Sequence, residues 1–152
     1  MSQTEILGTI PHRPPFLFLD SIDECSGDSI TCSQRFQPDA AFYGGHYPGN
    51  PITPGVLLCE SVFQAGAVLL SRKMEADGGA PRNRTPVLCR IEDARFKSIV
   101  RPGDSLTIQA SLRERLQDFY FLNGKVLRDG KAVLLIRFAL TLAADNPAST
   151  EK

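Results

Sequence analysis

The chain has 152 residues, with 17 basic and 17 acidic side chains and therefore a formal net charge of zero. A balanced charge creates no global field that would attract nucleic acid or an acidic membrane surface, so we expect neither as a partner. The length is that of one domain, residues 1–152, and such a domain buries a core without a metal ion or a disulfide bond to hold it together.

The cysteines and the first residues of the chain narrow the class further. Cys25, Cys32, Cys59 and Cys89 show no CxxC or other short metal-binding spacing. Three of them stand among apolar residues, where a reduced thiol packs as a small hydrophobic group, and we expect no metal site. The start of the chain has no basic segment followed by an apolar core, and no run of about 18 apolar residues occurs, so we expect a cytoplasmic protein.

The first half of the chain is predicted to form two strands and one helix. Residues 16–22 and 29–36 have strand composition, and apolar and polar residues alternate in the second segment. From Gly55 to about Lys73 there is no proline, and apolar side chains cover nearly the whole helical circumference. A helix with this pattern is predicted to be buried.

The second half is predicted to be rich in strands. Residues 75–86 contain glycine, proline and charged residues, which indicates an exposed loop. Strands are predicted at residues 87–92, 94–100, 105–114, 119–127 and 132–142. Asp129 and Gly130 predict a tight hairpin, because a primed turn needs positive φ. This order favours an α+β fold in which one antiparallel sheet wraps around one helix, and the polar tail at residues 143–152 is expected to be mobile.

One stretch carries residues suited to acid and base chemistry. Residues 42–64 read FYGGHYPGNPITPGVLLCESVFQ, with His46 fourteen residues before Glu60. The prolines and glycines between them prevent regular structure, so His46 is predicted on a rigid loop beside the first turns of the helix. Imidazole titrates near neutrality, as a general base requires. A carboxyl group buried in an apolar helix favours its protonated form, which suits a general acid.

Two further residues of this stretch extend the predicted site. Gln64 shares a helix face with Glu60 and is placed to orient its carboxyl group. Gly55 offers a backbone N–H without an intrahelical partner and no side chain to block a substrate carbonyl that gains negative charge. Simpler interpretations stay open: Glu60 and Gln64 satisfy each other or face a subunit interface, His46 is a surface residue, and Pro54 with Gly55 only starts the helix.

Three motifs carry a family resemblance. They are PHRPPFLFLD at residues 11–20, GHYPGNPITPGVLLCESVFQAG at residues 45–66 and ARFKSIVRPGD at residues 94–104. Together they resemble the 3-hydroxyacyl-acyl-carrier-protein dehydratases of fatty-acid synthesis, of the FabZ type, over about residues 10–142. The resemblance implies a hot-dog fold, an antiparallel sheet wrapped around one long central helix, and homodimers that commonly assemble into hexamers as trimers of dimers.

The resemblance also implies roles for the residues that match the family motif. His46 of one subunit would meet Glu60 of the other, the N–H of Gly55 would bind the thioester carbonyl, Gln64 would support the acid, and the backbone carbonyl of Ile52 would hold the histidine. The implied reaction removes water from a 3-hydroxyacyl thioester and yields a trans-2-enoyl thioester, without a metal or a redox cofactor. Which of the two side chains handles which proton stays open.

Departures from the family pattern leave some properties open. Glu60 stands where dehydratases that also isomerise the double bond usually carry aspartate, which favours simple dehydration. Tyr47 replaces the commoner phenylalanine, and Ser21 stands where arginine often follows the first motif, so acyl length and carrier docking are not determined. Two other functions stay open: a hot-dog acyl-thioester hydrolase and a non-catalytic acyl-binding subunit.

Residues outside the central motif suggest where a carrier would dock. Acyl carrier protein is acidic, so basic residues at the mouth of an acyl tunnel would attract it by an interaction that weakens with salt. We assign this rim to Arg95, Lys97 and Arg101, although such a cluster is more often a solvated face. His12 is interpreted as a residue that starts a strand or caps it, away from the reacting atoms.

Overall fold

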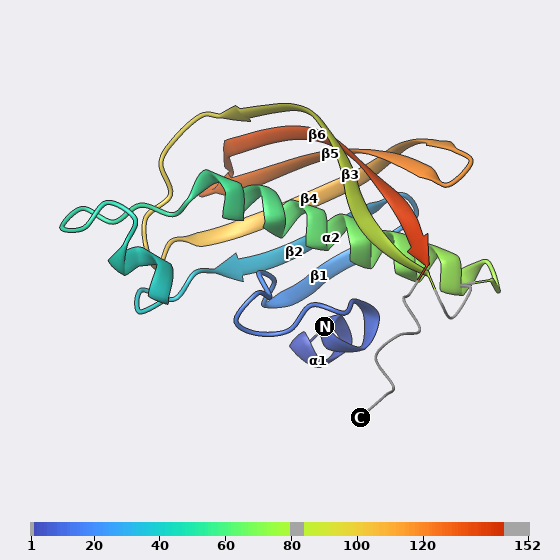
Figure 1. Ribbon diagram of the computed structural model, residues 1–152, viewed down its shortest axis with the longest axis horizontal. Helices are drawn as coiled ribbons and strands as arrows, with labels where there is room; N and C mark the ends of the chain where they lie inside the picture. The colour runs from blue at the N-terminus through green and yellow to red at the C-terminus, as the bar shows by residue number, and fades with distance from the viewer. Residues whose placement is uncertain (1, 80–83, 145–152) are drawn as a thin grey trace.

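The computed structural model describes residues 2–79 and 84–144 and shows an antiparallel sheet curved around one long helix (Figure 1). In chain order the elements are α1 (Gln3–Thr9), β1 (Ser21–Ser26), β2 (Ser29–Arg35), the 3-10 helix η1 (Ala41–Gly44), α2 (Gly55–Ala76), β3 (Arg84–Phe96), β4 (Ser105–Leu116), β5 (Phe119–Arg128) and β6 (Lys131–Ala144). Within the described ranges the six strands form one sheet in the order β1-β2-β4-β5-β6-β3. This is the predicted α+β hot-dog architecture.

The long helix α2 starts and stops where its sequence allows. It begins directly after Pro54, whose carbonyl accepts the amides of Leu57 and Leu58 at 3.0 and 3.3 Å. It ends before Gly78, whose φ of +74° suits the left-handed backbone that commonly terminates helices. Twelve residues of α2 are buried, all of them between Leu58 and Leu70, so the prediction of a buried helix is confirmed.

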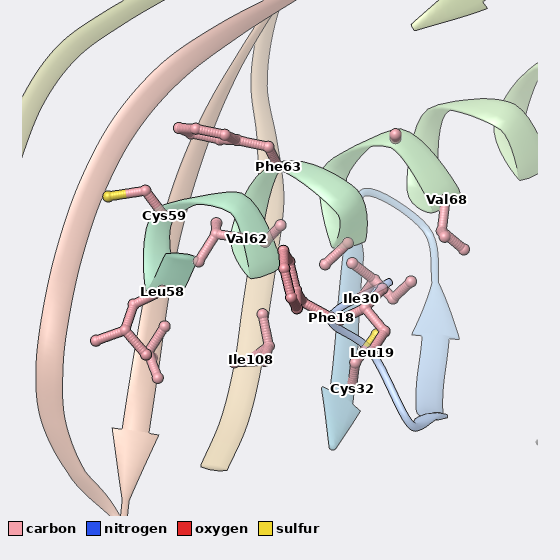
Figure 2. Packing of buried hydrophobic residues seen from close by; sticks show 14 of the residues in the cluster. Phe18, Leu19, Ile30, Cys32, Leu58, Cys59, Val62, Phe63, Val68 and Ile108 are labelled. Atoms are coloured by element: carbon pink, nitrogen blue, oxygen red, sulfur yellow. The ribbon is translucent and has the colours of Figure 1, made fainter. Parts of the chain in front are cut away.

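Close packing against the sheet holds α2 in place. Figure 2 shows side chains that leave the helix in different directions, with Phe63 and Cys59 on one side and Leu58 on another. A Cβ atom on Gly124 of β5 would overlap the Cγ1 atom of Val62. The absence of a side chain at this position of the sheet therefore lets the helix sit deep in the curved sheet.

The apolar character of α2 follows from its burial. The helix has the length of a membrane-spanning segment, 22 residues, and an 18-residue window with a mean hydropathy of 1.3. Of that window, 67% is buried inside the fold. A helix enclosed by a sheet needs apolar side chains on nearly every side, which accounts for this composition.

The first predicted strand begins later than expected. The sequence pattern predicts a strand at residues 16–22, but β1 starts at Ser21. The reason is that the backbone N–H of Phe18 and the carbonyl of Phe16 are bonded to the side chain of Gln64 instead of to a neighbouring strand. Residues 16–20 are therefore a loop attached to α2.

The strand after the helix is longer and less regular than predicted. The sequence pattern predicts two strands at residues 87–92 and 94–100, but β3 is one strand that pairs with β6 and ends at Phe96. Its register shifts between Leu88 and Arg90 and between Ile91 and Asp93. Such irregularities interrupt the alternation of side chains that the sequence prediction relied on.

The remaining differences concern the ends of elements. The helix α1 was not predicted, and Ile6 is its one buried residue. Of the predicted loop at residues 75–86, the first two residues extend α2 and the last three begin β3, while residues 80–83 lie outside the described ranges. Ala143 and Ala144 extend β6, and the rest of the predicted tail lies outside the described ranges. The hairpin at Asp129 and Gly130 is confirmed, with φ of 51° and 75°.

Candidate active site

His46 lies on the irregular segment between η1 and α2. In Figure 1 this segment is the teal loop that leads into the N-terminal end of α2. The backbone N–H of His46 donates to the backbone carbonyl of Phe42 at 3.0 Å. The next residue, Tyr47, has a φ of 60°, and Gly49 has a φ of 84°. The left-handed backbone of this loop therefore follows His46, since neither Gly44 nor Gly45 has a positive φ. A non-glycine residue in the left-handed region costs about 1–3 kcal/mol, so the surrounding contacts hold this turn against strain.

The imidazole of His46 has a defined orientation. Its Nδ1 atom lies 2.7 Å from the backbone carbonyl oxygen of Ile52, which is the contact that the family resemblance implies. Because a carbonyl oxygen can only accept, Nδ1 carries the proton, and the neutral ring has its lone pair on Nε2. The ring of Tyr47 stands at 90° to the imidazole with a centroid distance of 4.8 Å. His46 thus presents a basic nitrogen on the side away from Ile52.

A buried hydrogen bond supports the same loop. The hydroxyl groups of Tyr43 and Thr53 lie 2.6 Å apart, and the N–H of Thr53 donates to the carbonyl of Val100 at 2.8 Å. Burial raises the pKa of the Tyr43 hydroxyl, and the hydrogen bond with Thr53 opposes this effect. The phenol therefore stays neutral and ties the loop of His46 to the segment that follows β3.

Gly55 is the first residue of α2 and packs against an aromatic ring. Its N–H has no helical carbonyl one turn earlier to bond. The ring of Phe96 lies against it, and a Cβ atom on Gly55 would be only 2.7 Å from the Phe96 Cε1 atom. The Phe96 side chain is 52% exposed, so this ring borders the surface and not the core.

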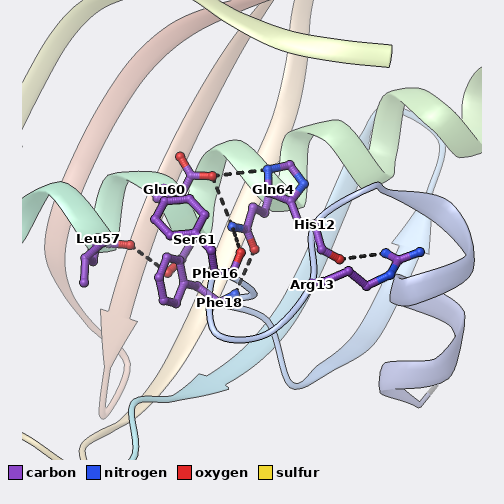
Figure 3. Close-up of polar contacts among 8 residues, drawn as sticks. All are labelled: His12, Arg13, Phe16, Phe18, Leu57, Glu60, Ser61 and Gln64. Atoms are coloured by element: carbon purple, nitrogen blue, oxygen red, sulfur yellow. Dashed lines mark hydrogen bonds and ion pairs between the residues drawn. The ribbon is translucent and has the colours of Figure 1, made fainter. Parts of the chain in front are cut away.

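The amide of Gln64 sets the orientation of the carboxyl group of Glu60 (Figure 3). The Oε1 atom of Gln64 accepts the N–H of Phe18 at 2.8 Å, and its Nε2 atom donates to the carbonyl of Phe16 at 3.2 Å. Because a backbone N–H can only donate, the amide can face only one way, with its NH2 group toward Glu60. This group donates to Glu60 Oε1 at 3.1 Å. Gln64 is fully buried, so the arrangement is shielded from water.

The two oxygens of Glu60 therefore differ. Oε1 accepts from Gln64, whereas Oε2 has no hydrogen-bond partner among the residues that the structure describes. A protonated Glu60 carries its proton on Oε2, because a proton on Oε1 would face the NH2 group of Gln64. The carboxyl side chain is 20% exposed and so can reach a ligand.

His12 lies beside Glu60, a contact that the sequence interpretation missed. Its Nε2 atom lies 3.4 Å from Glu60 Oε1, as Figure 3 shows, so its assignment as a remote capping residue is wrong. The segment that carries His12 folds back over α2, because Gln64 binds the backbone of Phe16 and Phe18. No local spacing in the sequence indicates this contact, since the two residues are far apart along the chain.

The predicted site residues form two groups within one chain. Glu60 and Gln64 are in contact on α2, together with His12, whereas His46 is held by Ile52. Between His46 and Glu60 the described part of the chain shows no hydrogen bond or ion pair. Residues 2–79 and 84–144 also contain no group of three or more His, Cys, Asp or Glu arranged for a metal ion.

The three basic residues assigned to carrier docking are all exposed. Arg101 donates to the side chain of Asn50 at 2.9 Å, beside the loop of His46. Arg95 pairs with Asp93 at 3.2 Å and borders a hollow of about 530 Å³ on the sheet. Lys97 follows β3 and donates its N–H to the carbonyl of Val133. The charges therefore extend from the loop of His46 to the end of β3.

Comparison with known proteins identifies relatives over most of the chain. Residues 10–137 match the family described as FabA-like domain. A protein of Lactobacillus helveticus (strain DPC 4571) named 3-hydroxyacyl-[acyl-carrier-protein] dehydratase FabZ is 36% identical, covering 86% of this chain and 83% of that protein. A protein of the same name from Caulobacter vibrioides (strain NA1000 / CB15N) is 33% identical, covering 94% of this chain and 89% of that protein.

A solved structure supports the fold independently. The dehydratase heterocomplex ApeI:P from Xenorhabdus doucetiae superposes with a TM-score of 0.76, covering 93% of this chain and 91% of that chain. Its sequence identity is 18%, so the likeness concerns the fold alone. From the family match and from the identity to its relatives we conclude that this chain belongs to the FabA-like domain family and has its hot-dog fold.

Proposed function

We propose that the protein is a hydro-lyase that removes water from 3-hydroxyacyl thioesters on acyl carrier protein and yields trans-2-enoyl thioesters for fatty-acid synthesis. The observation that carries the proposal is that hydrogen bonds orient one side chain as a base and another as an acid. His46 is bonded at Nδ1, which leaves Nε2 as a base, and Glu60 is bonded at Oε1, which leaves Oε2 to carry an acidic proton. The names of the relatives from Lactobacillus helveticus and Caulobacter vibrioides support the same substrate class.

The reaction that fits this geometry is an elimination with balanced proton transfers. Nε2 of His46 takes a proton from C2, and the electron pair moves toward the thioester carbonyl. The N–H of Gly55 stabilises the charge on the carbonyl oxygen, at the positive end of the α2 dipole. Oε2 of Glu60 then gives its proton to the C3 hydroxyl, which leaves as water while the double bond forms. Exchange with solvent returns the proton from His46 and restores Glu60.

A second copy of the chain is proposed to complete the site, so that His46 of one copy serves Glu60 of the other. The strand β3 supports this arrangement, because it lies at the edge of the sheet and has one unpaired side. Val87, Leu88 and Ile91 on this strand are 38%, 42% and 50% exposed. A long edge strand with exposed apolar side chains favours pairing with another strand. The mass measured by sedimentation distinguishes a homodimer from a hexamer assembled as a trimer of dimers.

Acyl carrier protein is proposed to deliver the substrate to a basic rim made of Arg95, Lys97 and Arg101. Their side chains are exposed, and Arg101 lies beside the loop that carries His46. An acidic carrier would thus be attracted toward the reacting groups.

The decisive experiment follows a short trans-2-enoyl thioester with the purified protein. Loss of the conjugated-enoyl absorbance and release of free thiol are recorded in parallel, for the wild type and for His46→Ala and Glu60→Gln. The proposal expects loss of absorbance without thiol release, and this loss is abolished in both variants. Glu114→Gln makes the same chemical change at an exposed position and is the matched control, expected to keep full activity. Release of thiol would instead indicate a thioester hydrolase. If neither the short thioester nor carrier-bound substrates were turned over, the protein would be a non-catalytic subunit.

A further inference from the structure

We infer that His12 is a positioning residue that fixes the acid Glu60 through its Nε2 atom, an inference that rests on the proposed function. The contact joins His12 Nε2 and Glu60 Oε1 at 3.4 Å. Gln64 donates to the same oxygen at 3.1 Å. Two donors directed at one carboxyl oxygen hold the group in a single rotamer, with Oε2 left for the substrate.

The surroundings of the His12 ring determine which nitrogen carries its proton. The Nδ1 atom is buried and has no hydrogen-bond partner among the residues that the structure describes. A proton on Nδ1 would leave a buried donor unsatisfied, whereas a bare Nδ1 leaves only a weaker acceptor unsatisfied. The neutral ring therefore carries its proton on Nε2, which faces Glu60 Oε1 at 3.4 Å.

The backbone around His12 is arranged to keep the ring at this place. Arg13 donates from Nη1 to the carbonyl of Ile10 at 2.8 Å and to that of His12 at 2.7 Å. Five residues beyond, the N–H of Phe18 donates to the side chain of Gln64, which is itself in contact with Glu60. The segment is thus clamped to α2 by the same side chain that orients the acid (Figure 3).

The contact between His12 Nε2 and Glu60 Oε1 has room to shorten. At 3.4 Å the two atoms are farther apart than in an ordinary N–H···O hydrogen bond of 2.7–3.2 Å. Catalytic hydrogen bonds are often long without substrate and shorten when the substrate binds. We expect His12 to move closer to Oε1 when a thioester fills the site, because the bound acyl group excludes water from Glu60.

The kinetic test compares two substitutions of similar size in the full-length protein. His12→Leu removes the donor, whereas His12→Gln keeps an N–H donor at about the reach of Nε2. We expect His12→Leu to lower kcat about 10- to 100-fold with little change in KM, because a misplaced acid affects the chemical step more than binding. His12→Gln should recover most of that loss, with melting temperatures of the two variants close to each other. Equal losses of kcat in both variants, or full kcat in His12→Leu, would overturn the inference.

A spectroscopic test is independent of turnover. The chain has two histidines, so the long-range 1H–15N spectrum of the labelled protein contains two ring systems, and His46→Ala assigns them. We expect opposite tautomers, with the proton on Nε2 in His12 and on Nδ1 in His46. Glu60→Gln should shift the signals of His12 and leave those of His46 in the same chain in place. Because Glu60 of one chain is proposed to face His46 of the other, the spectrum is recorded on the separated monomer or on a mixed dimer in which only the Glu60→Gln chain is labelled. A proton on Nδ1 of His12 would refute the inference, whether or not the wild-type protein dehydrates thioesters. Lack of turnover alone would refute only the proposed function.

Discussion

The ring of Phe96 fills the space that a side chain on Gly55 would need, with its Cε1 atom 2.7 Å from the position of a Cβ atom. We therefore predict that Gly55→Ala lowers kcat/KM by at least about 10-fold, because the methyl group and the displaced ring narrow the approach to the N–H of residue 55. The cost in stability should stay within about 1–3 kcal/mol, since the half-exposed ring can swing outward. Steady-state hydration of an enoyl thioester and urea denaturation measure the two effects.

The matched control is Phe96→Leu, alone and combined with Gly55→Ala. If the clash with the ring is the cause, the smaller leucine should restore part of the activity in the double variant. Wild-type kinetics in Gly55→Ala would show that turnover does not need close approach of the substrate to the N–H of residue 55.

Two inactive variants should restore activity when they are mixed. In a shared site, a dimer of one His46→Ala chain and one Glu60→Gln chain contains one intact site and one site with both defects. Random reassembly makes half of the dimers mixed, so we expect about a quarter of the wild-type activity. The variants are unfolded and refolded together, and each variant treated alone is the control. Lack of recovery despite proven mixed dimers would place both groups of a site in the same chain.

The packing of α2 against β5 predicts a large stability effect at Gly124. A Cβ atom there would overlap Val62 Cγ1 and come within 3.1 Å of Ile136 Cγ2 and 3.3 Å of Phe138 Cε1. These neighbours are buried and cannot move aside, so Gly124→Ala should destabilise the fold by about 1–3 kcal/mol in urea denaturation. In a protein that already carries Val62→Ala, the same Gly124→Ala change should cost less stability, because the overlapping Cγ1 atom is gone. A double-mutant cycle measures this difference as a coupling free energy. Independent, additive losses would show that the two elements do not meet at this point.

The free thiols should differ strongly in reactivity. Burial raises the pKa of Cys32 to about 12 and that of Cys59 to about 11. At pH 8 the thiolate fraction of Cys32 is then only ~10⁻⁴, since each pKa unit changes it tenfold, and its side chain is also buried. We expect a disulfide reagent to reach Cys32 only after unfolding, as peptide mass mapping will show. Rapid labelling of Cys32 in the folded protein would contradict this burial.

The basic rim predicts a dependence on carrier and on salt. Reversal of all three charges, as Arg95→Glu, Lys97→Glu and Arg101→Glu, should slow turnover of carrier-bound substrate at low ionic strength. The effect should shrink as salt rises, because the Debye length falls to about 3 Å at 1 M. A short thioester without a carrier is the control and should react at an unchanged rate. An unchanged rate on carrier-bound substrate at low salt would remove these residues from docking.

Much of the candidate site could be predicted from one continuous stretch of sequence. His46, Gly55, Glu60 and Gln64 fall within residues 42–64, where proline and glycine enforce a loop and the apolar pattern enforces a helix. The spacing of Glu60 and Gln64 places their side chains one helical turn apart, and the structure has them in contact. Short-range geometry is enough for these relationships.

The sequence also indicated one buried helix and an antiparallel sheet, because burial and alternation are properties of neighbouring residues. It misplaced the start of β1, and it divided β3 at its irregularities. Both errors have one cause. The hydrogen bonds of Phe16 and Phe18 are taken by Gln64, and the register of β3 is adjusted to β6, and both partners lie far away along the chain.

The sequence by itself thus determined the fold class, the loop of His46 and the acid–amide pair on α2, since each depends on residues within a few turns of one another. Only the tertiary structure decided that His12 reaches Glu60 and that Phe96 covers Gly55. Such contacts depend on how the sheet curves around α2 and on which side chains capture distant backbone groups. A local pattern carries no record of these long-range choices, because their free energy is gained only when separate segments of the chain pack together.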